Sequence, residues 1–237
     1  MYNAGVSKRS DAFNDLRSKP AYTVAEAARY LKVANATLRS WVVGRPSPKT
    51  DGVGHFRPLI HPPVRNPPLL SFSNLIEAHV LRSLRTEHGV SLKDVRQAIG
   101  HAEKVLGIKS LLLSKELRTQ GGDLLLERYG ELIELSASRQ LAMRRLFQEH
   151  VARVEWDEKQ FPIRLYPFVS GEMPFPDRSI AIDPTIAFGR PVVVRLSIGT
   201  GTIADRIDAG EQARDIAADY GLDLTEVEQA VLYERAA

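Results

Sequence analysis

The sequence predicts an α+β protein: an N-terminal winged helix-turn-helix, a middle β-hairpin followed by a long helix, and a small C-terminal helical domain that is itself helix-turn-helix-like. Three observations lead to this prediction. Two short helical patterns joined by a tight turn occupy residues 22–44, a proline-rich stretch follows them, and three glycine-separated helical patterns lie in the last forty residues.

The composition is that of an ordinary globular protein, with 43% hydrophobic and 26% charged residues among 237. The absence of cysteine excludes disulfides and thiolate metal sites and is typical of a reducing cytosol. The first residues do not read as a signal peptide, and no apolar run approaches the ~20 residues that span a bilayer. We therefore expect a cytoplasmic protein without a membrane partner.

Charge is unevenly distributed along the chain. Residues 1–60 contain ten lysines and arginines and four acidic residues, whereas residues 177–237 contain six and eleven. A basic N-terminal region suits a polyanion such as DNA, and an acidic C-terminal region suits a different partner.

The first helix of the N-terminal unit has a clear start signal. Thr23 is a good N-cap, and Glu26, three residues later, completes a capping box. Ala25, Ala28 and Leu31 then recur at helical spacing, so we expect a short amphipathic helix.

The second helix follows a tight turn at residues 32–33. Asn35 is its expected N-cap, Leu38 and Trp41 share one side, and Gly44 ends it. Two helices in this arrangement place the second in the major groove of DNA, with its N-terminal N–H groups toward phosphate. An ordinary helical hairpin is the alternative interpretation.

The candidate DNA-binding residues lie on this second helix and in the proline-rich stretch that follows it. Arg39 is suited to guanine or phosphate and Thr37 to a thymine methyl or phosphate, while Trp41 either packs inside or leans on the DNA backbone. The full set is Asn35, Ala36, Thr37, Arg39, Ser40, Trp41, Arg45, Lys49 and Arg57.

Residues 44–68 hold seven of the fourteen prolines, so they form neither a helix nor a central strand and are expected to be a wing or a linker. Two helices are predicted next, one capped by Ser73 and running through Arg85, and one capped by Ser91 and ending near Gly107.

In the middle region we expect a hairpin, with strands at 111–118 and 124–129 around a Gly121-Gly122 turn and a third strand at 132–135. A helix over 138–156, a short strand over 162–169 and a linker over 170–178 follow. The helix 138–156 carries an apolar stripe that includes His150, and it is the candidate dimer interface, although packing within the chain would produce the same stripe.

The C-terminal region contains strand candidates at 180–182 and 192–194 and helices at 202–209, 211–220 and 225–235. Asp223 or Thr225 is the expected cap of the last helix, with Glu228 placed for a capping box with Thr225. Residues 199–202 favour a turn and helix cap over a phosphate loop, because no lysine follows them. The last two helices form a second helix-turn-helix shape, but their acidic residues repel phosphate, so we place DNA at the other end of the chain.

Catalytic chemistry is not indicated. The six histidines are scattered without metal-ligand spacing, and no serine lies in a nucleophile elbow. We therefore expect no catalytic residue, no metal and no cofactor, and a protein that is not an enzyme.

The N-terminal unit resembles the helix-turn-helix of the MerR-type winged-helix regulators over residues 22–41, which read YTVAEAARYLKVANATLRSW. The resemblance extends weakly through the proline-rich stretch to Gly107. It departs from the family further on, since the predicted middle region is strand-rich and no cysteine is available for metal sensing.

The C-terminal unit is similar to a small helical domain of unknown function, on the motifs IDPTIAFGRPV (182–192), GTGTI (199–203), the Gly210-Glu211 pair and the aspartate-tyrosine turn ending at Leu222. Genes for such domains frequently adjoin genes for PIN-like ribonuclease toxins, and the whole chain resembles a VapB-type antitoxin. The predicted units are an arm (1–19), a MerR-like winged helix-turn-helix (20–107), a middle region (108–169), a linker (170–178) and an antitoxin-associated domain (179–237).

This resemblance implies an antitoxin of a type II toxin-antitoxin system that neutralises a PIN-like endoribonuclease and represses its own operon. The aspartate-rich site of such a toxin would favour an inserted basic side chain, for which Arg190 and Arg195 are the candidates. A homodimer is expected, because paired half-sites need paired readers. The alternatives are a stand-alone MerR-like regulator that responds to a small ligand, and a pure interaction scaffold.

Overall fold

The computed structural model describes residues 16–49, 52–56, 58–85, 92–107, 110–118, 120–132, 137–159, 161–168 and 178–236. The α-helices are α2 (Val24–Leu31), α3 (Asn35–Val42), α4 (Phe72–Arg85), α5 (Leu92–Leu106), α6 (Gln120–Leu132), α7 (Ala137–Ala152), α8 (Thr200–Asp208), α9 (Ala213–Tyr220) and α10 (Leu224–Arg235). Short 3-10 helices are η1 (Leu111–Leu113), η2 (Lys115–Arg118) and η3 (Ala187–Gly189).

The strands form small antiparallel sheets. They are β1 (Tyr22–Thr23), β2 (Arg45–Lys49), β3 (Gly52–Phe56), β4 (Val64–Arg65), β5 (Pro68–Leu70), β6 (Val154–Trp156), β7 (Pro162–Leu165), β8 (Ile180–Ala181), β9 (Val192–Val193) and β10 (Ile198–Gly199). Two sheets have three strands, in the orders β1-β5-β4 and β10-β9-β8, and the pairs β2-β3 and β6-β7 are two-stranded. Helices with small sheets confirm the predicted α+β class.

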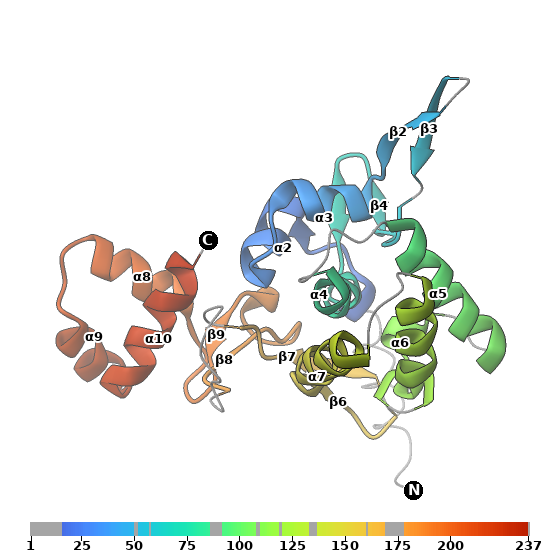
Figure 1. Cartoon of the computed structure of the whole chain (residues 1–237). Coiled ribbons are helices and arrows are strands. Elements are labelled where there is room, and N and C mark those ends of the chain that lie inside the picture. Colours follow the sequence, from blue (N-terminus) through green and yellow to red (C-terminus); the bar gives the residue numbers. More distant parts are fainter. Residues whose placement is uncertain are drawn as a thin grey trace, which may run out of the picture.

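The described chain has two lobes, which we call the head (residues 16–168) and the tail (residues 178–236). In Figure 1 the tail helices α8, α9 and α10 pack together at one side of the head. The larger hydrophobic cluster includes residues of α2 to α7 and of β6 and β7, and Ile182 of the tail joins it. A smaller cluster lies in the tail among α8, α9, α10 and Val193.

The first helix of the head begins as predicted. The side chain of Thr23 accepts a hydrogen bond from the Glu26 amide, and the Glu26 carboxylate accepts one from the Thr23 amide at 2.9 Å, so the capping box is confirmed. The helix ends at Lys32, whose left-handed backbone (φ 52°) turns the chain toward α3.

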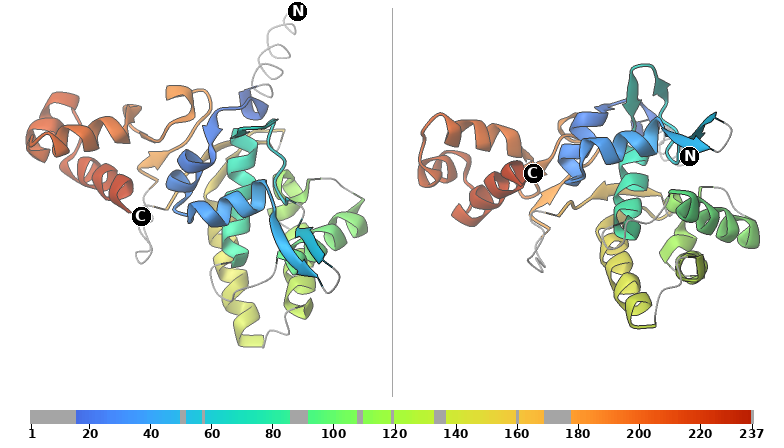
Figure 2. Two further views of the ribbon diagram at one scale, coloured as in Figure 1. Left: turned by 90° about the horizontal axis from the view of Figure 1, so that it is seen from above. Right: turned by 45° about the horizontal axis from the view of Figure 1, so that its top comes forward.

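The proline-rich stretch forms a hairpin rather than a linker at its start. Strands β2 and β3 pair in continuous register, from Arg45 opposite Phe56 to Lys49 opposite Gly52. Proline fits here because a two-stranded ribbon leaves half of its N–H groups unpaired. The hairpin continues from the end of α3 and projects from the head, as Figure 1 and the right view of Figure 2 show.

The predicted middle hairpin is wrong. Residues 111–118 form η1 and η2, and residues 120–132 form α6, so Leu132 ends a helix and the rest of the proposed third strand lies outside the described residues. The glycine pair at 121–122 lies inside α6 and forms no turn, and Gly122 allows close packing. A Cβ atom on Gly122 would lie 2.2 Å from the Leu117 carbonyl oxygen, so only glycine lets α6 approach η2 this closely.

Two other helix boundaries also differ from the prediction. Ser71 rather than Ser73 caps α4, because the Ser71 hydroxyl accepts from the Asn74 amide and the Asn74 side chain accepts from the Ser71 amide. The long helix ends at Ala152, and the chain then forms the strand pair β6-β7.

The apolar side of α7, our candidate dimer interface, is used inside the chain. Phe147 and Val151 are buried in the core of the head, and α7 packs against α4. His150 is buried with them, and its Nδ1 lies 2.8 Å from the Leu146 carbonyl oxygen, so it is a core histidine. Packing within the chain therefore accounts for the stripe.

Several contacts join the tail to the head. Ile182 pairs with Leu165 through two backbone hydrogen bonds of 2.8 and 3.0 Å, which extends the strand pair of the head into the tail. Another contact is made by α10: the buried Tyr233 hydroxyl donates to the Tyr30 carbonyl oxygen at 2.9 Å, and Lys32 donates to the Tyr233 carbonyl oxygen. The end of α2 is thus held against the last helix of the chain.

Candidate nucleic-acid interface and partner surface

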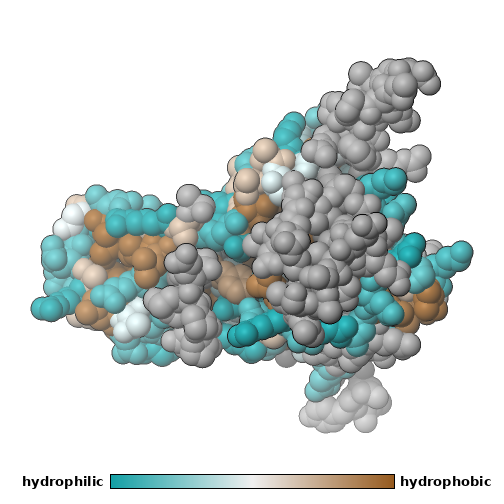
Figure 3. Space-filling view, in the orientation of Figure 1, coloured by the Kyte–Doolittle hydropathy of each residue, from teal (hydrophilic) through white to brown (hydrophobic). Residues whose placement is uncertain are grey.

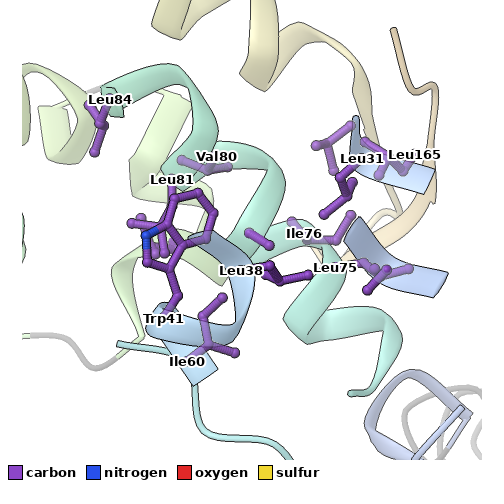
Figure 4. Packing of buried hydrophobic residues seen from close by; sticks show 14 of the residues in the cluster. Leu31, Leu38, Trp41, Ile60, Leu75, Ile76, Val80, Leu81, Leu84 and Leu165 are labelled. Carbon is purple, nitrogen blue, oxygen red and sulfur yellow. The ribbon is translucent and has the colours of Figure 1, made fainter. Parts of the chain in front are cut away.

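The inner side of α3 fixes the position of its outer side. Leu38, Trp41 and Val42 are buried and pack against α4, where Figure 4 shows the Trp41 ring beside Leu81 and close to Ile60. Trp41 is 1% exposed, which corrects its assignment as a DNA contact: its large ring has been drawn into the core of the head. It positions α3 and does not reach the surface.

The outer side of α3 carries the other candidates on the helix. Asn35, Ala36 and Arg39 are exposed, and Thr37 and Ser40 are half-buried. The Ser40 hydroxyl donates to the Thr37 carbonyl oxygen at 2.7 Å. Five of the predicted residues therefore share one accessible strip, and the only charge on it is the cation of Arg39.

The start of α3 differs from the prediction in a way that matters for anions. Ala34, not Asn35, is the N-cap, and no side chain accepts from the first amides of the helix. Asn35 is the first helical residue. The exposed N-terminus of α3 therefore has no carboxylate or hydroxyl closing it, and such a terminus favours a phosphate group.

The wing candidates are only partly described. Arg45 and Lys49 lie at the two ends of β2, at the base and the tip of the hairpin. Arg57 lies outside the described residues.

The turn between the two helices contains a lysine that motif reasoning did not single out. Burial between α2 and α10 lowers the pKa of Lys32 to about 8, and its Nζ lies 4.2 Å from the centre of the Tyr233 ring. The neighbouring Glu234 carboxylate opposes this pKa shift. No local pattern could have revealed the contact, because its partner is about two hundred residues away in the sequence.

The two candidate arginines of the tail are in different situations. Arg195 donates to the Glu226 carboxylate at 2.6 Å and to the Gly221 carbonyl oxygen at 2.8 Å. Arg190 is exposed, and within the described residues it has no side-chain hydrogen bond or ion pair. Arg190 lines the same cavity as Glu26 and helps to lower the pKa of that carboxyl, but no hydrogen bond within the described residues holds its side chain, so it is the more available of the two arginines.

Exposed apolar side chains gather on the tail. Figure 3 shows hydrophobic residues on the lobe formed by α8, α9 and α10. The large exposed hydrophobic residues of the tail are Phe188, Val194, Leu196, Leu224 and Leu232. Five of the nine large exposed hydrophobic residues of the described chain thus lie on the tail.

A cavity of about 500 Å³ lies between the two lobes. Its walls include Glu26 and Arg29 from α2, Arg190, and the start of α8 at residues 199–202. Charged groups of both signs line it, whereas sites for small molecules are mostly apolar. Among the described residues there is no group of three or more potential metal ligands. None of the described helices is long and apolar enough to cross a membrane.

Two protein-family models match the chain, one in each lobe. Residues 20–99 match a family described as "Putative DNA-binding HTH domain", which covers the helix-turn-helix, the hairpin and most of α4 and α5. Residues 180–233 match "Protein of unknown function (DUF433)", which covers almost the whole tail. The head is thus similar to a domain described as a putative DNA-binding helix-turn-helix.

One similarity to a curated protein spans both lobes. The chain is 29% identical over 223 residues to "Putative antitoxin VapB45" of Mycobacterium tuberculosis, which covers 86% of this chain and 89% of that protein. It is also 39% identical over 61 residues to "Uncharacterized protein Rv2308" of the same organism, about a quarter of each chain. The crystal structure of Rv2018 from M. tuberculosis has a similar fold, with a TM-score of 0.63 and 22% identity over 90% of this chain and 98% of that one.

Proposed function

We propose that the chain is the antitoxin of a type II toxin-antitoxin system, which binds its own operator through the head and a PIN-like endoribonuclease toxin through the tail. The observation that carries the proposal is the pairing of an open, uncapped helix α3 with a separate acidic lobe. The similarity over both lobes to a protein named as an antitoxin supports it. The role requires no catalysis, and both similarities support a non-enzymatic protein.

The DNA side of the proposal depends on α3 and the hairpin. The exposed strip of Asn35, Ala36 and Arg39 enters the major groove, with the open helix N-terminus toward a phosphate. Thr37 and Ser40 lie at the edge of this strip, and Arg45, Lys49 and Arg57 of the hairpin region supply phosphate contacts. Two copies reading paired half-sites would form a homodimer.

The DNA contact is tested with Arg39→Ala and a duplex from upstream of the chain's own gene. If Arg39 reads a base, operator binding weakens by about 1–3 kcal/mol and the sequence preference at one position relaxes. Arg145→Ala is the matched control, because Arg145 is an exposed arginine on α7 that is distant from α3 in sequence and faces solvent. Unchanged affinity and preference in the Arg39 variant would remove α3 from the DNA interface.

The toxin side depends on the tail. Arg190 and Arg195 are the predicted toxin-binding residues, and Arg190, whose side chain is exposed and not held by a hydrogen bond within the described residues, is the stronger candidate for an aspartate-rich site. The test is co-purification of the chain with the product of the adjoining gene, followed by an assay of ribonuclease inhibition. A stoichiometric, inhibited complex supports the antitoxin role, whereas failure to form one removes it.

The cavity between the lobes favours a second candidate, a MerR-like regulator that responds to a small polar ligand. Its volume is within the range of ligand sites, although its charged walls are unusual for one. In that case the adjoining gene product does not bind, and metabolite extracts raise the melting temperature of the wild-type chain but not that of Thr200→Val.

A further inference from the structure

The turn that joins α2 to α3 is short and strained. Only Lys32, Val33 and Ala34 separate the two helices, so their backbone sets the angle at which α3 leaves α2. Lys32 lies in the left-handed region, with φ 52° and ψ 47°, where a residue with a Cβ atom is uncommon because the conformation costs free energy. Such a conformation persists only where the surrounding structure imposes it. Contacts from outside the turn therefore have to hold it.

Two of these contacts reach the last carbonyl groups of α2, which have no partner within the helix. The Tyr30 carbonyl oxygen accepts a hydrogen bond of 2.9 Å from the Tyr233 hydroxyl of α10. The Leu31 carbonyl oxygen accepts one of 2.8 Å from Arg82 of α4. The end of α2 is thus fixed by one donor from the tail and one from the head. Because the bond from Tyr233 is buried, its loss would leave an unsatisfied carbonyl group.

The side chain of Lys32 makes the turn depend on the same residue of the tail. It donates to the Tyr233 carbonyl oxygen, and its Nζ lies 4.2 Å from the centre of the Tyr233 ring. The hydroxyl of Tyr233 therefore holds the last turn of α2, while its ring and carbonyl group hold the residue that ends the helix. These contacts join residues 201 positions apart in the sequence.

Tyr233 is itself fixed by the tail. Its side chain is fully buried and packs on Ile180 of β8, and the helix that carries it packs against α8. The tail also rests on β1, where a Cβ atom on Gly189 would lie 2.1 Å from the Tyr22 hydroxyl oxygen, so that only glycine fits. The tail therefore presents α10 to the end of α2 as a fixed support.

The turn decides where the N-terminal end of α3 points. The second half of α3 is anchored, because Leu38 and Trp41 are buried on its inner side, as Figure 4 shows. Asn35 and Ala36 at its start are exposed, so the position of this end depends on the turn before it. This end contains the uncapped N-terminus and two of the residues proposed to enter the major groove. A small change at Lys32 would move it while the core of the head stays in place.

We infer that Tyr233 is a positioning residue for DNA recognition: together with Lys32 it sets the orientation of α3, so the tail is part of the DNA-reading unit. The inference rests on the proposed operator binding and deepens it by assigning sequence discrimination in part to a residue outside the proposed DNA surface. Phosphate contacts depend on charge and carry no sequence information, whereas base contacts need the side chains of α3 to meet base edges. Loss of the Tyr233 contact therefore reduces specific binding more than non-specific binding.

The first test is Tyr233→Phe, which removes one hydroxyl group and keeps the ring in the core. The probes are a duplex from upstream of the chain's own gene and a scrambled duplex of the same length and base composition, at one salt concentration. We expect the dissociation constant for the upstream duplex to rise by about 3- to 10-fold, the contribution of one hydrogen bond, and that for the scrambled duplex to change by less than ~2-fold. Tyr220→Phe, the same substitution at the end of α9, is the matched control and changes neither.

A substitution of the other partner tests the same contact. Lys32→Asn removes the amine, and asparagine tolerates left-handed backbone. We expect it to lower the preference for the upstream duplex as Tyr233→Phe does, and the double variant to be little worse than either single variant, because both break one contact network. Lys32→Arg, which keeps a cationic donor, retains most of the preference. Lys104→Asn, at an exposed position of α5, controls for the loss of charge.

The outcomes separate this inference from the proposed function. A wild-type chain without preference for the upstream duplex overturns operator binding and the inference together. A wild-type chain whose preference is unchanged by Tyr233→Phe overturns only the inference. If Tyr233→Phe weakens binding to both duplexes equally, or lowers the melting temperature without changing the preference, Tyr233 only stabilises the chain and the inference is wrong.

A second measurement needs no DNA. In hydrogen exchange of the full chain, the amides of residues 33–38 should exchange faster in Tyr233→Phe than in the wild type, because the turn and the start of α3 open more readily. The amides of α4 should be unchanged, as should residues 33–38 in Tyr220→Phe. Equal exchange of residues 33–38 in the two variants contradicts the inference.

Discussion

The chain contains two helix-turn-helix units, α2-α3 in the head and α9-α10 in the tail, and the start of the second helix distinguishes them. In the head, α3 begins at Ala34 without a side-chain cap. In the tail, α10 begins with a capping box in which Asp223 and Glu226 close the N-terminus with two carboxylates. The first terminus can accept a phosphate, whereas the second already holds negative charge.

The turns of the two units differ in a related way. The tail uses Gly221 for the left-handed residue that ends α9, which is the usual choice. The head uses Lys32, a strained residue whose ammonium group is held by the carbonyl oxygen of Tyr233. The turn of the tail unit therefore needs no contact from elsewhere, whereas the turn of the head unit is held by a residue of the tail. Two units with the same helix-turn-helix pattern can thus differ in their chemistry.

The largest effect is expected from a substitution that asks whether the head and the tail unfold independently. Trp41→Ala removes the large ring that positions α3 and should destabilise the head by about 3–5 kcal/mol. The tail cluster, which includes Ile203, Ile216 and Val227, remains intact. Urea unfolding of the variant should then show an early transition in Trp156 fluorescence and a later one in far-UV circular dichroism.

Val227→Ala provides the opposite arm of this experiment, because it removes part of the tail cluster and leaves the Trp156 transition in place. A single transition that moves together for both probes in both variants would show that the lobes unfold as one unit.

A smaller effect is expected from Glu77, a buried acid in the head whose pKa is not lowered by any cation of the described residues. Burial raises the pKa of Glu77 to about 7, Glu103 adds to this, and a hydrogen bond from Asn74 opposes it. The folded state therefore binds the proton more tightly than the unfolded state, so stability falls as pH rises from about 4.5 to about 7.

Glu77→Gln keeps the shape of the protonated acid and removes the charge. We expect it to raise the free energy of unfolding by on the order of 2 kcal/mol at pH 8 and to change it little at pH 4.5. Glu149→Gln, at an exposed position of α7, is the control. The assignment is wrong if both variants give the same pH dependence as the wild-type chain.

The smallest effect is expected at the tail surface. Arg206 donates to the carboxylates of Glu211 and Asp219, with a distance of 2.7 Å to the latter. Because exposed ion pairs contribute little to stability, Arg206→Ala should leave the melting temperature unchanged at physiological salt. A clear drop in the melting temperature would show that the surface charges of the tail are part of its stability.

Several features could be predicted from neighbouring residues alone. The capping box of Thr23 and Glu26 and the glycine at 221 are confirmed, because the hydrogen bonds that start and end helices join residues only three or four positions apart. The sequence offers two caps for α10, Asp223 and Thr225: Asp223 forms the capping box, with Glu226, and the pairing of Thr225 with Glu228 does not form. Competing caps one turn apart look alike in sequence.

The sequence by itself therefore determined the α+β fold class, the helix-turn-helix of the head and the helices of the tail, since local hydrogen bonding and periodicity specify them. Only the tertiary structure decided which way residues face. It buried Trp41 between α3 and α4, made Gly122 a close packing contact, and left Phe188 in solvent on a strained loop. Those outcomes depend on partners far away in the sequence, such as Ile60 for Trp41 and Tyr22 for the loop, and no local pattern contains them.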